Sequence, residues 1–472
     1  DYLRLKTNGL NESIYHKKNL GELPRYEALL GLLPYAFSEA PKNAFVVGFG
    51  GGFTVDLLTS LPIAKVRVVE LEKAILQAAE RAHNGRNMVL RRPNLNLSVE
   101  DARYVLATRS GGPYDIIVSQ PSQSWLAGAA NLFTREFFEI VRSNLSSKGV
   151  YSQWLNLYNM DTVTLRSLLR TFYSVFPEGA VFSGEGDQEM ILVGALQPLK
   201  LNEAEVTRLA KLSLFSKKLV TVPLREPADL LSHFVMDRAG ALAISASAPW
   251  NTDRNAFAET RQSRLFYEGV PDAESPQTFL VAHYQPTSPL LASAPSADLP
   301  YLVLSSLNDN HQPGKFKKLL EVYGAASPDT PLQWGKLGYL YLKARRYEDA
   351  RKFLEKALAA APSTTHLNLL MSSLMDLKRN KEVLHVAARH TRLADKITEC
   401  YVAGAHLNQG HAGVVAGSMK KMLADVTGYT NACGDFFNRI VGDYHYLIQN
   451  YAVAAPFYEA YQSAFRHDVV VN

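Results

Sequence analysis

The sequence predicts an α/β domain built on a mostly parallel, doubly wound sheet, followed by an all-α repeat domain. A glycine-rich turn, Gly48 to Gly52, lies between two apolar runs of strand type, 44–47 and 66–69. Strands then alternate with helical segments of about ten to fifteen residues, as in parallel sheets. From Thr330 onward the apolar residues follow a helical pattern with a period of about 34 residues.

The N-terminal element, residues 1–40, combines a hairpin with a helix. Asn8-Gly9 is a favoured two-residue hairpin turn. Apolar residues predict a helix over 26–37.

Residues 41–265 supply the sheet. We expect strands at 44–47, 66–69, 95–99, 114–119, 150–154 and 190–194, and helices at 72–83, 134–145 and 161–176. Asp161 is expected to cap the last of these helices. Prolines recur among Ser and Ala after residue 271, so 266–328 is predicted to be a linker or covering segment, and 329–472 the repeat domain.

The composition is that of an ordinary globular chain. Its 472 residues exceed what one core needs, and the formal net charge of +5 is small for that length. No Lys/Arg-rich run indicates a nucleic-acid face, so no nucleic-acid partner is expected. No stretch approaches the about 18 consecutive apolar residues of a membrane span. The chain starts at Asp1 rather than Met, which leaves a membrane segment upstream open.

The cysteines and histidines predict neither a disulfide framework nor a metal. Cys400 and Cys433 are the only two cysteines, so we expect a reducing, cytoplasmic location, with membrane association only if a membrane segment precedes Asp1. His406 and His411 do not fall on one helix face and have no acid or cysteine set nearby. We interpret them as surface or core histidines.

The stretch 45–72 reads strand, glycine turn, helix, strand and acid, the order of a nucleotide-binding βαβ unit. Glycine lets the backbone approach a ligand, and Glu70 after the second strand can accept two ribose hydroxyls. The glycine spacing is not GxGxxG. An adenosyl sulfonium compound therefore suits the turn better than a pyrophosphate. A glycine turn of some other α/β loop is the alternative.

Several segments of residues 5–265 resemble the spermidine-synthase-like superfamily, and most of all its subgroup often fused to a membrane transporter-like domain. In chain order they are ELPRYEALLGLLPYAF, VVGFGGGFTVDLL, VRVVELEKAI, VEDARYVL, YDIIVSQPSQSW, NLFTREFFEIVRSNLSSKGVYSQWLNLY and NTDRNAFAE. The resemblance implies a Rossmann-like, methyltransferase-type fold. It also implies S-adenosylmethionine or its decarboxylated form as co-substrate.

The same resemblance assigns contacts to individual residues. Those expected at the co-substrate are Gly48, Gly50, Gly51, Glu70, Asp101 and Ala102. Glu70 would hold the ribose hydroxyls and Asp101 the adenine amino group, with Ala102 beside the ring. Capping of a following helix is the alternative for both acids. Tyr26 matches a position that shapes the acceptor pocket, with core packing as its alternative.

Three departures argue against polyamine aminopropyl transfer. Gly51, Gln120 and Gln123 stand where a spermidine synthase carries a loop acid and an Asp-x-x-Asp pair. Each lost charge-assisted bond removes about 1.5–3 kcal/mol from cation binding. Glutamine also cannot act as a base at pH 7. A loop without its acid tolerates the carboxylate of intact S-adenosylmethionine, so we expect methyl transfer in preference to aminopropyl transfer.

The acceptor side is less defined. We take Gln120, Gln123 and Tyr158 as candidates at the reacting groups, and Trp125 and Trp154 as walls of an apolar or cationic pocket, with packing as the alternative. Methyl transfer to a deprotonated nucleophile needs mainly positioning. The acceptor, a small molecule or a protein, stays open. So do a non-catalytic scaffold and an aminopropyltransferase with relocated acids.

The last part of the chain resembles tetratricopeptide repeats. The matching positions are Trp334, Leu337, Gly338, Tyr341, Ala350, Leu354, Ala357 and Pro362. In that family Gly338 and Ala350 would be small because two helices cross there. Weaker copies are expected at 367–392, 401–425 and around Gly442 to Tyr458. Such repeats bind a protein partner in a groove. A packing or dimerisation arm, and hence a homo-oligomer, is the alternative.

Overall fold

The computed structural model describes residues 2–7, 10–16, 25–82, 89–109, 111–121, 123–184, 188–211, 224–269, 275–286, 290, 299–309, 312–325, 328 and 330–468. The chain divides into two compact units, Asp1–Lys318 and Leu319–Asn472. None of the helices in these ranges is long and apolar enough to cross a membrane. Within the same ranges, no group of three or more His, Cys, Asp or Glu side chains is placed to hold a metal ion.

Unit 1 begins with the expected hairpin. Strands β1 (Tyr2–Thr7) and β2 (Leu10–His16) pair antiparallel. The predicted turn at Asn8-Gly9 lies outside the described residues. Helix α1 (Arg25–Ala36) follows, close to the predicted bounds.

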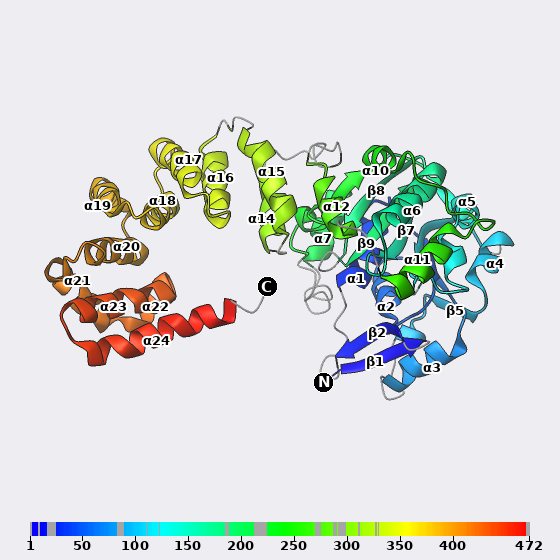
Figure 1. Cartoon of the computed structure of the whole chain (residues 1–472), viewed down its shortest axis with the longest axis horizontal. Coiled ribbons are helices and arrows are strands. Elements are labelled where there is room, and N and C mark those ends of the chain that lie inside the picture. The colour runs from blue at the N-terminus through cyan, green and yellow to red at the C-terminus, as the bar shows by residue number, and fades with distance from the viewer. Residues whose placement is uncertain are drawn as a thin grey trace. The chain divides into compact units, whose positions relative to one another are not determined.

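The described residues then form an eight-stranded mixed sheet (Figure 1). Its strands are β3 (Asn43–Val47), β4 (Lys65–Glu70), β5 (Leu95–Val99), β6 (Tyr114–Ser119), β7 (Leu145–Asn156), β8 (Glu178–Ser183), β9 (Glu189–Ala195) and β10 (Phe234–Asp237). Their spatial order is β10-β8-β9-β7-β6-β3-β4-β5. The pairs from β5 to β7 are parallel, whereas β9, β8 and β10 add antiparallel pairs. The α/β prediction is confirmed, and the antiparallel edge is an addition to it.

Helices cover both faces of this sheet, which explains why its central strands are apolar on both sides. On one face α1 packs beside α2 (Phe53–Ser60). On the other lie α4 (Ala102–Ala107), α5 (Arg135–Asn144) and α6 (Thr162–Val175), which pack in sequence. Helix α3 (Lys73–Ala82) connects β4 to β5 in the same direction across the sheet as α2 connects β3 to β4, so it lies on the face of α1 and α2. Alternate residues of β7 show the division. The Ser152 hydroxyl donates to Leu30 O of α1, while the Tyr151 ring stacks on Phe172 of α6.

The interval predicted as a linker or covering segment carries helices and belongs to unit 1 as far as residue 318. It contains α12 (Pro276–Ala282), α14 (Leu299–Asp309) and the start of α15 (Pro313–Ala325). Leu280 packs into the main core, and the buried Lys315 ammonium donates to Ser183 Oγ at 2.9 Å. The Pro/Ser/Ala composition did not indicate these helices. The other helices that the structure describes in this unit are η1 (Val89–Arg91), η2 (Ala130–Phe133), α7 (Glu203–Ala210), α9 (Pro227–Leu231), α10 (Arg238–Ser245) and α11 (Phe257–Glu268).

Unit 2 is helical throughout its described residues. It consists of α16 (Pro331–Lys343), α17 (Tyr347–Ala360), α18 (Thr364–Asp376), α19 (Asn380–Arg389), η3 (Thr391–Leu393), α20 (Lys396–Leu407), α21 (Ala412–Ala424), α22 (Val426–Cys433), α23 (Asp435–Leu447) and α24 (Tyr451–Asp468). Successive helices pair. A Cβ on Gly338 would lie 2.4 Å from Leu354 Cγ, so α16 and α17 cross closely at that glycine. The helical pairs are consistent with repeats.

One expectation about unit 2 is wrong. Cys400 of α20 and Cys433 at the end of α22 form a disulfide. The sequence count could not show this pairing because 33 positions separate the two residues, and the folding of α20 against α22 brings them together. The expectation of a reducing compartment rested on the lack of a disulfide, and this disulfide removes that support.

Candidate functional site

The topology selects one edge of the sheet for ligand binding. From β3 the chain builds outward through β4 and β5, and then returns to β6 on the other side of β3. Open α/β sheets bind ligands in the crevice outside the carboxyl ends of the strands at such a switch point. Gly48 follows β3 and Gln120 follows β6, so both lie at this crevice.

The glycine turn needs its glycines for two different reasons. Gly48, Gly50 and Gly52 have φ values of 86°, 53° and 81°, in the left-handed region that favours glycine. At Gly52 a Cβ would also lie 2.7 Å from the buried Phe49 ring. At Gly50 a Cβ would lie 3.3 Å from Gln120 Nε2. The turn is therefore shaped to pass close to its neighbours and then to start α2 at Phe53.

Glu70 ends β4 and is buried at 7% exposure. Its Oε2 accepts the backbone N–H of Phe49 at 2.7 Å, and its Oε1 accepts the N–H of Glu72 at 2.9 Å. Each carboxylate oxygen has about two acceptor sites, so one remains on each for a ribose hydroxyl. The acid thus fixes the glycine turn and still faces the pocket.

Asp101 follows β5 and caps α4. Its Oδ1 accepts the backbone N–H groups of Arg103 at 2.8 Å and Tyr104 at 3.3 Å. Helix capping, the alternative raised for this acid, is thus present in the structure. Its side chain is exposed and lies on the wall of the pocket next to Ala102.

One pocket of about 300 Å3 gathers most of the predicted co-substrate residues. Those that line it are Gly48, Gly50, Glu70, Asp101 and Ala102. Gln120, which was expected at the reacting groups, lines it as well. Gly51 does not line it, although it belongs to the same turn. The Gln120 amide donates from Nε2 to Phe49 O at 3.3 Å, while its Oε1 is buried without a hydrogen-bond partner among the described residues. The glycine turn thus forms one wall of the pocket, and the neutral amide of Gln120 forms part of another.

The segment after β6 closes the pocket and is tied down at both ends. Its residues on the wall include Leu126, Gly128 and Leu132. Ser124 donates to Gln262 at 2.6 Å at one end, and Asn251 Nδ2 donates to the Phe133 carbonyl at 2.9 Å at the other.

Asp253, from the segment NTDRNAFAE, holds the same wall from outside. It accepts Arg103 Nη1 at 3.0 Å and the Thr134 hydroxyl at 2.7 Å. Burial raises the pKa of Asp253, but the hydrogen bonds from Arg103 and Thr134 outweigh burial and hold this pKa below its usual range. Asn251 and Asp253 therefore act on the pocket by fastening its wall, a role that their sequence positions did not reveal.

The predicted acceptor residues form two aromatic pairs outside the residues that line this pocket. The rings of Tyr26 and Trp154 lie 6.2 Å apart, and those of Trp125 and Tyr158 meet edge to face at 6.1 Å. Gln123 is buried, and its Oε1 has no partner in the described part of the chain. Trp154 is next to the residue at which β7 leaves its pairing with β6, so this cluster lies at the same carboxyl edge.

Sequence reasoning missed Glu27, the residue after Tyr26. It is 5% exposed, and its Oε1 accepts the Tyr26 hydroxyl at 3.0 Å. Burial raises the pKa of the Glu27 carboxyl to about 8, with a smaller contribution from Glu189, while the Tyr26 hydrogen bond lowers it. The signal available in the sequence was a single acid in an otherwise apolar helix, from Tyr26 to Leu33.

Asp161, which was expected to cap a helix, does so. Its Oδ1 accepts the backbone N–H of Thr164 at 2.8 Å, and its Oδ2 accepts Arg261 Nε at 2.7 Å. Burial raises the pKa of Asp161, but these bonds outweigh burial and lower it overall. Asp161 is therefore a structural acid rather than a replacement base.

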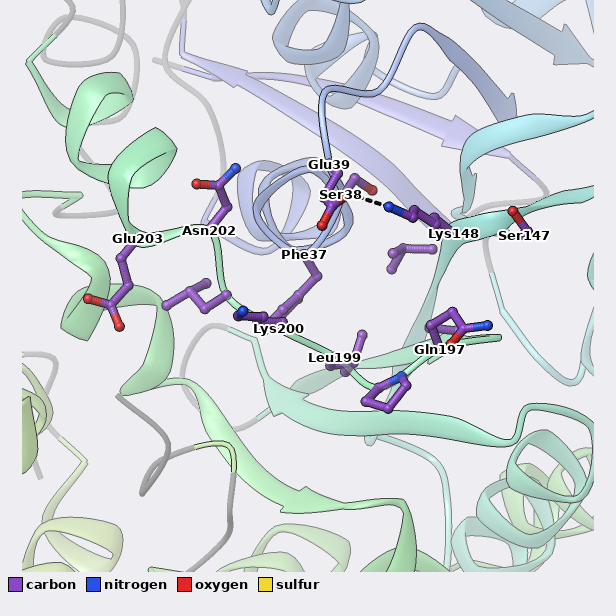
Figure 2. Close-up of a pocket in the computed structure, with 14 residues that line it drawn as sticks. Phe37, Ser38, Glu39, Ser147, Lys148, Gln197, Leu199, Lys200, Asn202 and Glu203 are labelled. Atoms are coloured by element: carbon purple, nitrogen blue, oxygen red, sulfur yellow. Dashed lines mark hydrogen bonds and ion pairs between the residues drawn. The ribbon is translucent and has the colours of Figure 1, made fainter. Parts of the chain in front are cut away.

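A larger cavity of about 700 Å3 lies at the opposite edge of the sheet (Figure 2). It is bordered by the end of α1 and the start of β7, where Glu39 and Lys148 face one another. Parallel strands present their amino ends at that edge, away from the switch point. We therefore place the functional site at the smaller pocket.

Known proteins are similar to the part of the chain that contains this pocket. Residues 23–183 match the spermine/spermidine synthase domain. Polyamine aminopropyltransferase 2 of Pseudomonas aeruginosa is 27% identical over 172 residues, which cover 36% of this chain and 46% of that protein. The polyamine aminopropyltransferase of Methanocaldococcus jannaschii is 27% identical over 142 residues, 29% of this chain and 47% of that protein. The chain thus spans about half the length of these curated relatives.

Among solved structures, a spermidine synthase in complex with the transition state analogue AdoDATO aligns with a TM-score of 0.42 and 15% identity. The alignment covers 51% of this chain and 79% of that chain. The matched domain, 23–183, includes the glycine turn, Glu70, Asp101 and both glutamines, and it ends before unit 2.

Proposed function

We propose that this protein is an S-adenosylmethionine-dependent transferase whose adenosyl sulfonium co-substrate binds in the β3/β6 pocket. The observation that carries the proposal is that the glycine turn, Glu70 and Asp101 line one pocket of about 300 Å3. Glu70 offers acceptor sites for the ribose hydroxyls, and Asp101 offers its second oxygen for the adenine amino group. The similarity to aminopropyltransferases and the match of residues 23–183 support the same co-substrate class.

Methyl transfer fits the site better than aminopropyl transfer. The wall that follows β6 presents the neutral amide of Gln120, and the turn carries Gly51 where the resembling family has an acid. A site without those carboxylates stabilises the ammonium of a decarboxylated co-substrate or polyamine less. It also repels the carboxylate of intact S-adenosylmethionine less.

A second candidate is a non-catalytic scaffold that kept the fold. The observation in its favour is that both oxygens of Glu70 already accept backbone N–H groups, so the acid has a structural role without any ligand. In either case unit 2, as tetratricopeptide-type repeats, would contact a protein partner.

Calorimetry of the full chain with S-adenosylmethionine, its decarboxylated form and methylthioadenosine separates the candidates. The proposal expects S-adenosylmethionine to bind more tightly than the decarboxylated compound. Binding of the decarboxylated compound alone would instead indicate aminopropyl transfer. If none of the three binds, the scaffold is favoured.

A further inference from the structure

We propose that Glu27 is the acid–base group of the acceptor site, binding a primary amine beside Trp154 and taking its proton before transfer. This inference rests on the proposed function and names its acceptor class. It concerns a residue on α1, distinct from Gln120 and Gln123, which occupy the places of the resembling family's acids.

Glu27 lies at the ligand-binding edge because the contacts of α1 place its first turn there. The end of α1 lies near the start of β7, where Glu39 pairs with Lys148, and its middle contacts Ser152 at Leu30 O. The first turn of α1 therefore reaches the carboxyl end of β7, where Tyr26 meets Trp154. The Thr54 hydroxyl, two residues beyond the glycine turn, donates to Glu27 O at 3.0 Å. Glu27 thus lies between the glycine turn and the end of β7.

The polar atoms of this cluster are incompletely satisfied. Glu27 Oε2 and Asn156 Oδ1 are buried acceptors that have no hydrogen-bond partner among the described residues. Trp154 Nε1 is a buried donor that likewise has no partner among them. Trp154 and Asn156 point to the α1 face of β7 because alternate residues of a strand share a face. Unpaired buried polar groups cost about 1–3 kcal/mol each, so a ligand that pairs with them gains that energy.

The set favours an amine over an alcohol. An ammonium brings three donors to an acceptor-rich cluster and is attracted by the faces of tryptophan and tyrosine rings. Glu189 on β9 adds a second carboxyl close enough to raise the pKa of both Glu27 and Tyr26. Tyr26 and Tyr158, which belong to the cluster, are half-buried.

Among the described residues, three side chains influence Glu27 directly. Tyr26 on its own helix donates to it, Glu189 on β9 repels its charge, and Thr54 on α2 contacts its backbone. Tyr158, after β7, influences Tyr26 in turn. With a pKa of about 8, the Glu27 carboxyl is protonated at neutral pH in the free protein. When an ammonium binds, the carboxyl releases this proton to solvent and pairs with the ammonium as a carboxylate.

The proposed step balances. The Glu27 carboxylate takes one proton from the ammonium, which frees the nitrogen lone pair. The lone pair forms a bond to the transferred carbon, and the electrons of the carbon–sulfur bond go to sulfur. The products are a substituted ammonium, a neutral thioether and a protonated Glu27.

Propylamine is the probe for the test, added to the full chain saturated with methylthioadenosine. For the wild type, its affinity should rise about tenfold per pH unit below pH 8 and level off above it. Calorimetry in two buffers should detect release of about one proton on binding at pH 7. Glu27→Gln should bind at least about tenfold more weakly at pH 9, with no pH dependence and no proton release.

Glu39→Gln, in the exposed turn that follows α1, is the matched control and should behave as wild type. Glu27→Asp should keep the pH dependence at weaker affinity. Methylthioadenosine binding by each variant shows that the fold and the co-substrate site are intact. A pH profile and proton release unchanged in Glu27→Gln would overturn the assignment. If methylthioadenosine fails to bind the wild type, the proposed function fails, while the propylamine profile without it still tests Glu27.

Discussion

The carboxylate of Glu70 accepts the backbone N–H of Phe49 at 2.7 Å, which fastens the end of β4 to the glycine turn after β3. Its other oxygen accepts the N–H of Glu72. The acid that is proposed to hold the ribose therefore also fixes the backbone around it. A ligand that binds Glu70 meets a turn already set in position, which lowers the entropy lost on binding.

Replacing Glu70 should reveal both roles. Glu70→Ala leaves the buried N–H of Phe49 and the partly buried N–H of Glu72 without this acceptor, so we expect a loss of about 1–3 kcal/mol in unfolding free energy and loss of nucleoside binding. Glu70→Gln keeps one acceptor oxygen and should be the more stable of the two, yet still bind methylthioadenosine weakly. Urea unfolding and calorimetry measure these effects. A folded Glu70→Ala protein with wild-type affinity would remove the ribose assignment.

Gln120→Asp tests whether the pocket is merely neutralised. A carboxylate cannot donate to Phe49 O as the Gln120 amide does, so the turn should lose about 0.5–1.5 kcal/mol of stability. Affinity for amines should nevertheless rise, because a charge returns beside the pocket. Thermal unfolding and propylamine titration give the two readouts. An unchanged amine affinity would mean that the acceptor lies elsewhere.

Glu27 should make stability depend on pH in a defined direction. Its folded pKa, about 8, is raised above the ordinary value of 4.5, so its contribution is fully present below about pH 4.5 and is lost as pH rises toward 8. Glu27→Gln should not lose stability in this way, because glutamine does not ionise. We expect it to be more stable than wild type by up to a few kcal/mol at pH 8–9, with a difference that shrinks near pH 4. Urea unfolding at several pH values measures this. A pH-independent difference would contradict it.

Gly338 and Gly413 form a matched pair in unit 2. A Cβ at Gly338 would lie 2.4 Å from Leu354 Cγ, whereas one at Gly413 would have nothing within 4 Å. Gly338→Ala should destabilise the unit by about 1–3 kcal/mol through overpacking. Gly413→Ala should stabilise it by about 0.5–1 kcal/mol, because alanine favours the helix. Thermal unfolding compares them. Equal effects would refute the close crossing of α16 and α17.

The disulfide gives a redox prediction. Closing a loop of 33 positions should stabilise unit 2 by about 3–4 kcal/mol. A reducing agent, or Cys400→Ser, should therefore lower its unfolding temperature. Mass spectrometry after thiol alkylation checks the bond itself. Two freely alkylated cysteines in protein kept oxidised would show that the bond does not form.

The sequence by itself determined the local elements and which residues gather at the carboxyl edge of the sheet. The apolar runs of β3, β4 and β6 and the glycines between them required a strand, a turn and a strand, because only glycine fits the positive φ of Gly48 and Gly52. Glu70 ends β4 and Asp101 lies two residues after β5, and parallel neighbouring strands bring such positions together. Gly338 likewise indicated the close crossing of two helices, at which Leu354 of the second helix occupies the space beside the glycine.

Only the tertiary structure decided which distant groups meet. Glu27 acquires its raised pKa because α1 buries it near Glu189, 162 positions along the chain, and Cys400 reaches Cys433 through the packing of α20 and α22. Asp253 reaches Arg103 across 150 positions to hold the pocket wall. Local patterns encode backbone conformation, whereas burial and pairing depend on segments whose separation no periodicity records. For that reason most residues that line the pocket after β3 and β6 could be predicted from the sequence, whereas the surroundings of Glu27 could not.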